Sequence, residues 1–415
     1  MRDTYIIGIG MTQIAKHLDR SIKGLAKESL EKCLSDAGVN MDQLQAAWFS
    51  NSSQGIFTDQ HCIRGQVCLR PLGLDGIPII NVENACGSGS TALHSAWLSV
   101  AAGQHECALA IGAEKMYSED KGKTMSAFFA GFDVERIPEH LALLGELGKS
   151  VKDPDEEDTG EAGKDRSPFM DVYSAVCRDH MENFGTTQAQ LAAVAEKSHF
   201  HSTMNPNAQY QKAFTIEEIL NDKKVSYPLT RSMCAPIGDG SAAVIVCSEE
   251  FMKSLSNAEP VRILASVLQS GVDRKIDQYD KDIAVRAGRL AYEMAGLIPE
   301  NVDLAEVHDA SSFSEIHMTK ALGFCPLGEG GQFAESGETR LGGKIPINTS
   351  GGLVSQGHPI GATGLAQIHE LVLQLRGKAG TRQVEGARIA LAENGGGNIG
   401  YEEAAMCVHI LENSA

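Results

Sequence analysis

Apolar residues change their spacing repeatedly along the chain, and the changes mark alternating strands and helices. The first residues, "MRDTYIIGIGMT", form a short apolar run typical of a strand, and residues 77–84 form another. Along 92–101, apolar residues instead recur at the three- and four-residue spacing of one helix face. Because this alternation continues through most of the 415 residues, the sequence predicts an α/β fold of stacked layers.

A similar plan occurs twice in the chain. Residues 29–53 and 291–312 each contain an amphipathic helix, an Ala-Gly stop, a short polar link and a strand that enters a polar turn. Gly38 and Gly296 fall at the same point of the two plans, and a glycine directly after a helix commonly ends it. The repeat predicts two similar halves.

The predicted halves are residues 1–255 and 256–415. They meet near 250–260, where a polar helix precedes a new strand. Residues of about 117–230 interrupt the alternation with helices and long polar loops, so we predict that they form an insertion in the first half. Long excursions from an α/β core often cover a binding site.

The stretch "NVENACGSGSTALHSAW" (81–97) places one cysteine between a strand and a helix of small residues. Cys86 lies at or just before the helix N-terminus, where free backbone N–H groups and the helix dipole favour a thiolate and lower the thiol pKa. The glycines and serines that follow leave the approach to its sulfur open. The alternative is that Cys86 only fills a gap in the core, as most free cysteines do. This stretch alone leaves both interpretations open.

Two histidines stand at the ends of other elements. His358 lies in "NTSGGLVSQGHPIGATG" (348–364), a glycine-rich loop that enters a helix near residue 362, and the proline after it restricts its backbone. A histidine so placed is a candidate general base. His308 ends a strand in "EVHDASSFSEI" (306–316). Near the end of the chain, the glycine turn "ENGGG" (393–397) separates two strand-like runs.

In this order, the segments resemble the thiolase superfamily, and most closely the sterol-carrier-protein-2 type of thiolase. "NVENACGSGSTA" resembles the nucleophile segment, "CAPIGDGSAAVIV" (234–246) the turn and strand that close the first half, and "VHDASSFSEI" the H-D-x-F segment. The loop around His358 resembles the catalytic histidine loop, and the similarity covers essentially the whole chain. The resemblance implies two pseudo-twofold-related halves in five layers, α-β-α-β-α, which agrees with the repeat.

The resemblance also implies a mechanism. Cys86 would attack the 3-oxo carbonyl of an acyl-CoA while His358 takes its proton. Carbon–carbon cleavage would release an acyl-CoA enolate near His308 and His358, and free CoA would then collect the acyl group from the sulfur. The backbone N–H groups of Cys86 and of Gly395 or Gly396 would hold the tetrahedral oxyanion. CoA is then a co-substrate, with no permanently bound cofactor.

The chain departs from the family pattern at the second catalytic cysteine. Where many thiolases have it, in a C-x-G turn near the C-terminus, this chain has Glu393 or Asn394, depending on the register. Where the sterol-carrier-protein-2 type has it, in H-D-C-F, this chain has Ala310. The remaining Cys-His-His set is similar to that of ketoacyl synthases, and proton transfer falls to His308, to Glu393 or to a water.

A further departure concerns the substrate pocket. Ser311 replaces the aromatic residue of H-D-x-F, and Phe313 follows two residues later. We expect a wider or more polar pocket, and therefore a bulky, aromatic or carboxylated acyl chain. Bacterial members that lack the second cysteine often work with a small subunit carrying a zinc ribbon and an OB domain, and one such enzyme cleaves 2-benzoylsuccinyl-CoA. The resemblance thus implies a homodimer, paired through an edge strand of the first half, and adds such a partner subunit as a hypothesis.

Composition excludes several other classes. The net charge of −18, without a basic block, argues against a nucleic-acid or anionic-membrane surface. No run of about 18 apolar residues occurs, and the opening residues form a strand-like run without the basic and apolar regions of a secretory leader, so we expect none. Ten cysteines without a C-x-x-C pair argue against a zinc ribbon in this chain and against a disulfide framework. We expect a cytoplasmic protein with reduced thiols and no bound metal.

Three alternative functions stay open at this point. A ketoacyl-synthase-like condensing enzyme would suit the Cys-His-His set, although an acidic chain offers no basic docking patch for an acyl carrier. A retro-aldolase on the same scaffold would not need the intact motif around Cys86. A non-catalytic lipid-transfer or scaffold protein would not need Cys86 and His358 together.

Overall fold

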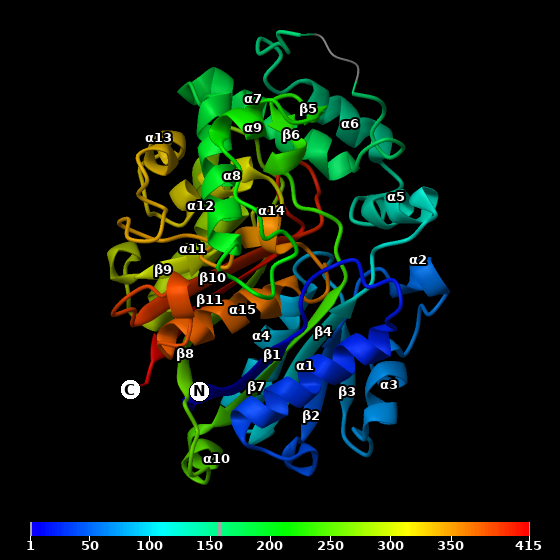
Figure 1. Cartoon of the computed structure of the whole chain (residues 1–415), viewed down its shortest axis with the longest axis vertical. Helices are drawn as coiled ribbons and strands as arrows, with labels where there is room; N and C mark the ends of the chain where they lie inside the picture. Colours follow the sequence, from blue (N-terminus) through cyan, green and yellow to red (C-terminus); the bar gives the residue numbers. More distant parts are fainter. Residues whose placement is uncertain (1, 156–158, 415) are drawn as a thin grey trace.

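Within residues 2–155 and 159–414, which the computed structural model describes, a mixed sheet of nine strands runs through the protein in the order β3-β2-β4-β7-β1-β8-β11-β10-β9 (Figure 1). The strands from the first part of the chain are β1 (Thr4–Met11), β2 (Ala46–Ser50), β3 (Ile79–Val82), β4 (Cys107–Glu114) and β7 (Gly240–Ser248). Those from the second part are β8 (Val261–Ser270), β9 (Leu304–Glu306), β10 (Ile389–Gly396) and β11 (Ala405–Asn413).

The pairing pattern repeats itself on the two sides of the β1–β8 junction. Outward from β1, the pairs β1–β7 and β7–β4 are antiparallel, and the pair β4–β2 is parallel. Outward from β8, the pairs β8–β11 and β11–β10 are likewise antiparallel, and the pair β10–β9 is parallel. The two series meet through Tyr5–Arg262 and Ile6–Val261. This common order confirms the pseudo-twofold fold expected from the sequence.

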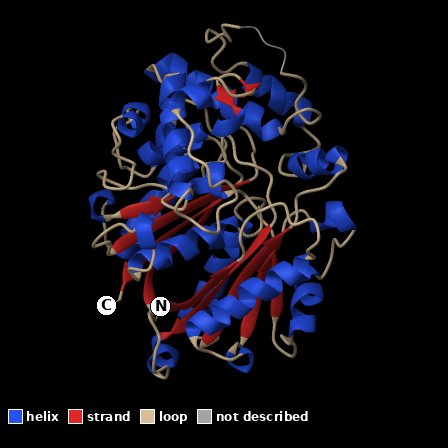
Figure 2. Ribbon diagram, in the orientation of Figure 1, coloured by secondary structure: helices blue, strands red, loops and turns tan. Residues whose placement is uncertain are grey.

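Three apolar clusters separate five layers of helices and strands (Figure 2). In β1, Ile7 faces the outer helix α1 (Ile22–Ala37), whereas Ile6 faces the central layer, because successive strand residues point to opposite faces. The central layer consists of α4 (Ser88–Ala101) and α15 (Thr363–Leu375), which pack against each other and against strands of both halves. On the far side, α11 (Ile283–Ala295) and α12 (Ser312–Ala321) form the outer layer.

The repeated helix-to-strand plan folds alike in both halves. α1 ends at Gly38 with φ 63° and α11 ends at Gly296 with φ 68°, both in the left-handed region that glycine favours. A short 3₁₀ turn follows each stop, at Met41–Gln43 and at Pro299–Asn301, before β2 and β9 begin. The glycine that the sequence predicts at the end of each helix is therefore present at both sites.

A largely helical region lies between β4 and β7 and covers one end of the sheet (Figure 1). Its elements are α5 (Lys121–Phe129), α6 (Ile137–Gly145), α7 (Pro168–Phe184), α8 (Gln188–Ser202), α9 (Ile216–Leu220), β5 (Lys224–Ser226) and β6 (Leu229–Thr230). The remaining short helices are α2 (Gln54–Thr58), α3 (Arg64–Leu69), α10 (Glu249–Lys253), α13 (Gly330–Glu335) and α14 (Gly352–Gln356). Among the described helices, none combines the length and apolar character needed to cross a lipid bilayer.

Candidate active site

The turn from β3 into α4 holds Cys86 in place by local hydrogen bonds. Ala85 adopts φ 47°, an unusual left-handed conformation for a residue with a side chain. The Gly87 N–H donates to Asn84 O at 2.9 Å, and the Ser88 hydroxyl donates to Ala85 O at 2.6 Å. These bonds fix a sharp bend that presents Cys86 immediately before the helix.

The environment of the Cys86 sulfur overturns one expectation from the sequence. Burial, and next the nearby Glu114 carboxyl, raise the pKa of the Cys86 thiol to about 12. A helix N-terminus stabilises a negative charge by about 0.3–1 kcal/mol, which is less than one pKa unit. Desolvation therefore outweighs the helix dipole, and the prediction of a lowered thiol pKa is wrong. The thiol stays protonated until a base removes its proton.

His358 has the hydrogen-bond arrangement of such a base. Its Nδ1 lies 2.7 Å from the Thr363 hydroxyl oxygen, and that hydroxyl donates to Pro359 O at 3.1 Å. The Thr363 oxygen therefore accepts from Nδ1–H, which assigns the lone pair to Nε2. Nε2 is buried without a hydrogen-bond partner among the described residues. Burial, and next the proximity of His308, lowers the pKa of His358 well below its usual value, so the ring is neutral.

His308, which follows β9, has the opposite tautomer. The Asn394 amide nitrogen lies 2.9 Å from His308 Nδ1, and because an amide NH₂ can only donate, Nδ1 accepts and Nε2 carries the hydrogen. Burial lowers the pKa of His308 to about 4, so at neutral pH the ring offers an N–H donor rather than an acidic imidazolium. The His308 backbone N–H donates to Glu393 Oε2 at 2.9 Å.

The three predicted catalytic residues come together in the structure. The Cys86 sulfur and a ring nitrogen of each histidine, His308 and His358, all lie within 4.8 Å of one another. The two imidazole rings are 5.1 Å apart at an interplanar angle of 84°. Thiolate and imidazole are also zinc ligands, and within residues 2–155 and 159–414 no other group of three such side chains is close enough to hold a metal.

The "ENGGG" segment lies directly beside the nucleophile turn. A Cβ atom added to Gly396 would lie 2.1 Å from Asn84 O and 2.9 Å from Cys86 N, so only glycine permits this approach. Gly395 instead faces Glu403, whose Cγ would lie 2.8 Å from such an atom. Burial raises the pKa of Glu393 to about 8, and its Oε1 has no hydrogen-bond partner among the described residues.

A cavity of about 270 Å³ contains Cys86 and His358 in its lining. The expected pocket residues Ser311 and Phe313 are not among its lining residues, and this expectation is wrong in detail. Ser311 is fully buried with its hydroxyl 3.1 Å from that of Ser314, and Phe313 lines a second, smaller cavity. Ala310 takes their place in the lining.

Several functional candidates were missed from the sequence because they lie far from the motifs. The helical region contributes apolar lining residues, among them Met125, Phe128, Phe169, Met170 and Tyr173. Cys234 also lines the cavity, in a segment whose Ala235 N–H donates to Ala310 O at 3.0 Å. Its only sequence signal is its place at the start of "CAPIGDG".

Glu114, at the end of β4, stabilises the loop that presents His358. Its buried carboxyl accepts hydrogen bonds from Asn51, Ser52, Ser53 and Gly361. Gly361 belongs to the loop that presents His358, and Ser50 Oγ also donates to Gly361 O at 2.7 Å. A carboxyl at the end of the apolar run "ALAIGAE" is the signal that could have identified it.

Comparison with known proteins places the chain among thiolases. The family model for the thiolase N-terminal domain matches residues 4–227, and that for the thiolase C-terminal domain-like family matches 269–413. An acetyl-CoA acetyltransferase of Methanothermobacter thermautotrophicus is 38% identical over 99% of this chain and 100% of its own. Sterol carrier protein 2 of Oryctolagus cuniculus is 38% identical over 94% of this chain and 69% of its own. Benzoylsuccinyl-CoA thiolase subunit BbsB of Thauera aromatica is 34% identical over 95% of both chains.

Two solved structures share the fold. One contains an Ltp2-ChsH2(DUF35) aldolase, with a TM-score of 0.76 and 23% identity over 99% of this chain and 98% of that one. The other is the human mitochondrial 3-ketoacyl-CoA thiolase in complex with CoA, with a TM-score of 0.72 and 16% identity over 100% of this chain and 98% of that one.

Proposed function

Because the chain belongs to the thiolase family, we propose that it is an acyltransferase that cleaves a 3-oxoacyl-CoA with free CoA through an acyl-Cys86 intermediate. The observation that supports this most is the convergence of Cys86, His308 and His358 within 4.8 Å. The names of two relatives, an acetyl-CoA acetyltransferase and a thiolase subunit, describe the same class of reaction.

In the first step, the free lone pair of His358 Nε2 takes the proton of the Cys86 thiol. The thiolate attacks the 3-oxo carbon, and the oxyanion receives hydrogen bonds from the backbone N–H groups of Cys86 and of Gly396. The close approach of Gly396 to the nucleophile turn supports this pairing. Base assistance is needed because the pKa of the thiol is raised to about 12.

In the second step, the bond between C2 and C3 breaks and an acyl-CoA enolate leaves. The Nε2–H of His308 donates a hydrogen bond to the enolate oxygen, a role that suits a neutral imidazole better than proton transfer. Glu393, with its pKa raised to about 8, is a candidate proton donor at neutral pH. CoA thiol then attacks the acyl-Cys86 thioester and regenerates the enzyme.

The lining of the cavity supports a bulky or aromatic acyl chain. Its volume of about 270 Å³ is larger than an acetyl group needs, and its Met and Phe side chains offer an apolar surface to a longer or aromatic chain. Arg231, whose side chain is 69% exposed and paired with Asp222 at 2.7 Å, also lines the cavity, and its remaining N–H donors suit a carboxylate or the phosphates of CoA. The relative from Thauera aromatica is named for benzoylsuccinyl-CoA, a substrate that is both aromatic and carboxylated.

We further propose the assembly and location expected from the sequence. β3 ends the sheet and exposes Ile80, so a second copy could pair with this edge in a homodimer. Residues 1–255 and 256–415 would be the two halves, with 117–230 as the insertion. The names of the thiolase subunit BbsB and of the Ltp2-ChsH2(DUF35) aldolase describe proteins with a second component, which supports a partner subunit; we expect it to be the small zinc-ribbon protein. Ten free cysteines suit the cytoplasm.

A panel of 3-oxoacyl-CoAs with acetyl, straight-chain and aromatic acyl groups tests the proposal. Each is mixed with the protein, with and without CoA, and the products and the tryptic peptide of Cys86 are identified by mass. We expect an acyl adduct on Cys86 that disappears when CoA is added. Cys86→Ala should lose turnover by on the order of 10⁶-fold, whereas Cys62→Ala, at an exposed thiol, should not. Thiolysis by Cys86→Ala at the wild-type rate would refute the proposal.

A further inference from the structure

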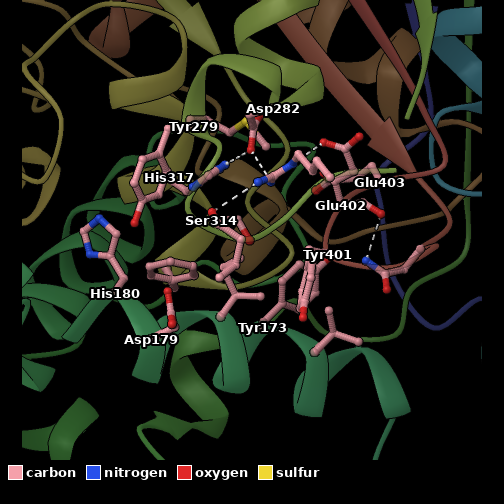
Figure 3. A pocket seen from close by; sticks show the side chains of 17 residues that line it. Tyr173, Asp179, His180, Tyr279, Asp282, Ser314, His317, Tyr401, Glu402 and Glu403 are labelled. Carbon is pink, nitrogen blue, oxygen red and sulfur yellow. Dashed lines mark hydrogen bonds and ion pairs between the residues drawn. The ribbon is translucent and has the colours of Figure 1, made fainter. Parts of the chain in front are cut away.

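A second cavity lies beside the one that contains Cys86. It measures about 60 Å³, enough for a few water molecules, and its lining combines aromatic and aliphatic side chains with several charged ones (Figure 3). Asp282 binds His317 Nε2 at 3.1 Å and Arg274 at 2.8 Å, and Asp179, Glu402 and Glu403 are the other acidic residues of the lining. The first cavity, of about 270 Å³, is the larger of the two, and the second holds the denser group of charged side chains.

Tyr173, on α7, is the one described residue that lines both cavities. The structure gives its hydroxyl no hydrogen-bond partner among the described residues. Burial raises the pKa of the phenol well above its usual value, and the Cys86 thiol, then the Glu403 and Glu393 carboxyls, raise it further. Tyr173 therefore borders both the cavity that contains Cys86 and the cavity that contains Glu403.

Glu403 connects the second cavity to the nucleophile turn. Its Cγ packs against Gly395, next to the glycine that contacts the Cys86 turn. Burial raises the pKa of Glu403, with Asp282 as the next cause, so its carboxyl retains a proton to a higher pH than an exposed glutamate does. Because Glu403 and Tyr173 line the same cavity, a protonated Glu403 carboxyl is a proton source on the side of the second cavity.

Resting on the proposed thiolase function, we propose that Tyr173 is the acid and base that replaces the missing second cysteine, with Glu403 behind it as a proton store. When the C2–C3 bond breaks, its electron pair remains on C2, and the Tyr173 hydroxyl gives its proton to that carbon. The resulting phenolate takes the proton of the incoming CoA thiol, and Glu403 stabilises the phenolate between these steps by sharing its proton.

The proton count closes without another reactant. The Cys86 proton moves to His358 Nε2 and returns to the sulfur when the acyl group leaves. The Tyr173 proton moves to C2 and is replaced from CoA. A phenol with a raised pKa suits both directions, because an enolate carbon is the stronger base and a thiol, with an ordinary pKa of about 8.5, is the stronger acid.

Tyr173→Phe tests the proposal, with acetoacetyl-CoA and CoA as the probe. Tyr227→Phe is the control, because Tyr227 is among the lining residues of neither cavity. We expect Tyr173→Phe to lose 10²- to 10⁴-fold in thiolysis and to slow solvent-deuterium exchange at C2 of acetyl-CoA to a similar degree. Alkylation of Cys86 by iodoacetamide should keep its wild-type rate, and Glu403→Gln should lose less than Tyr173→Phe.

Thiolysis and exchange by Tyr173→Phe within a few-fold of wild type would overturn the role of Tyr173. Loss of Cys86 alkylation together with thiolysis would also overturn it, because the tyrosine would then support the structure of the site. A wild-type protein that forms no acyl-Cys86 with any 3-oxoacyl-CoA refutes instead the function on which the proposal rests. The wild-type reaction therefore separates the two failures.

Discussion

The two central helices, α4 and α15, occupy matching places in the two halves but present different chemistry. α4 begins two residues after Cys86, a half-buried residue whose thiol pKa is raised by burial. α15 begins five residues after His358, and its first residue, Thr363, fixes the imidazole Nδ1. One helix start therefore presents a thiol that needs a base, and the other presents the base with its lone pair directed by a hydrogen bond.

The difference teaches that the catalytic groups depend on contacts between the halves. Glu114 and Ser50, from the first half, hold Gly361 of the His358 loop. Gly396, from the second half, rests on the Cys86 turn. Each half thus positions the reactive group of the other, and neither half alone contains a complete site.

The largest effect on this comparison is expected from His358→Ala. Removing the base should lower thiolysis by about 10²- to 10⁴-fold at neutral pH. The thiol of Cys86, with its pKa near 12, would then have to ionise unaided, so the residual rate should rise about tenfold per pH unit below that value. The measurement is the pH profile of turnover from pH 6 to 10.

The control for this variant is His105→Ala, since His105 is outside the site. Its profile should follow the wild type. A His358→Ala profile that is flat across the same range would show that Cys86 does not depend on His358 for ionisation, and the assigned pairing would be wrong.

The two histidines provide a second comparison, with a smaller expected effect. His308→Ala should lower turnover by about 10²- to 10³-fold, because it removes one donor to the enolate oxygen. His308→Gln retains an N–H group and should recover part of this loss. Cys86 alkylation should keep its wild-type rate in both variants. Steady-state kinetics on one 3-oxoacyl-CoA measures the turnover of both variants. Equal losses of turnover in His308→Gln and His308→Ala would contradict a donor role.

Much of this arrangement could be predicted from the sequence, because it depends on local signals. The glycine stops at Gly38 and Gly296, the strand-to-helix turn at Cys86 and the helix near residue 362 follow from spacing and from glycine chemistry. The five layers followed from the resemblance and from the repeated plan. These features need only a few consecutive residues to be specified.

The environment of the side chains could not be predicted in the same way. The pKa of Cys86 depends on burial and on Glu114, which is 28 positions away along the chain. Whether Ala310 or Ser311 faces the cavity depends on the pairing of this segment with Cys234, since neighbouring residues of an extended segment point in opposite directions. Tyr173 belongs to a helical region with no motif.

The smallest predicted effect concerns Glu393, the carboxyl beside His308. Its pKa is raised to about 8 in the folded protein, whereas an unfolded glutamate titrates near 4.3. The folded state therefore retains a proton that the unfolded state releases. This contribution to stability is complete below the unfolded pKa and is lost as pH rises toward 8. Glu393→Gln cannot ionise and retains an oxygen that can accept from the His308 N–H.

The difference in melting temperature between Glu393→Gln and the wild type should consequently be near zero at pH 4.5. It should grow in favour of the variant up to about pH 8 and then level off. Above that pH, Glu393 of the wild type is ionised in the folded state as well as in the unfolded state. Exposed Glu217→Gln serves as the matched control and should show no such growth. Thermal unfolding of each protein at half-unit pH steps measures these differences in melting temperature. If the variant were instead less stable than the wild type at pH 8, the ionised Glu393 would be the form that the fold favours, and Glu393 would be excluded as a rival of Tyr173 for the proton donor.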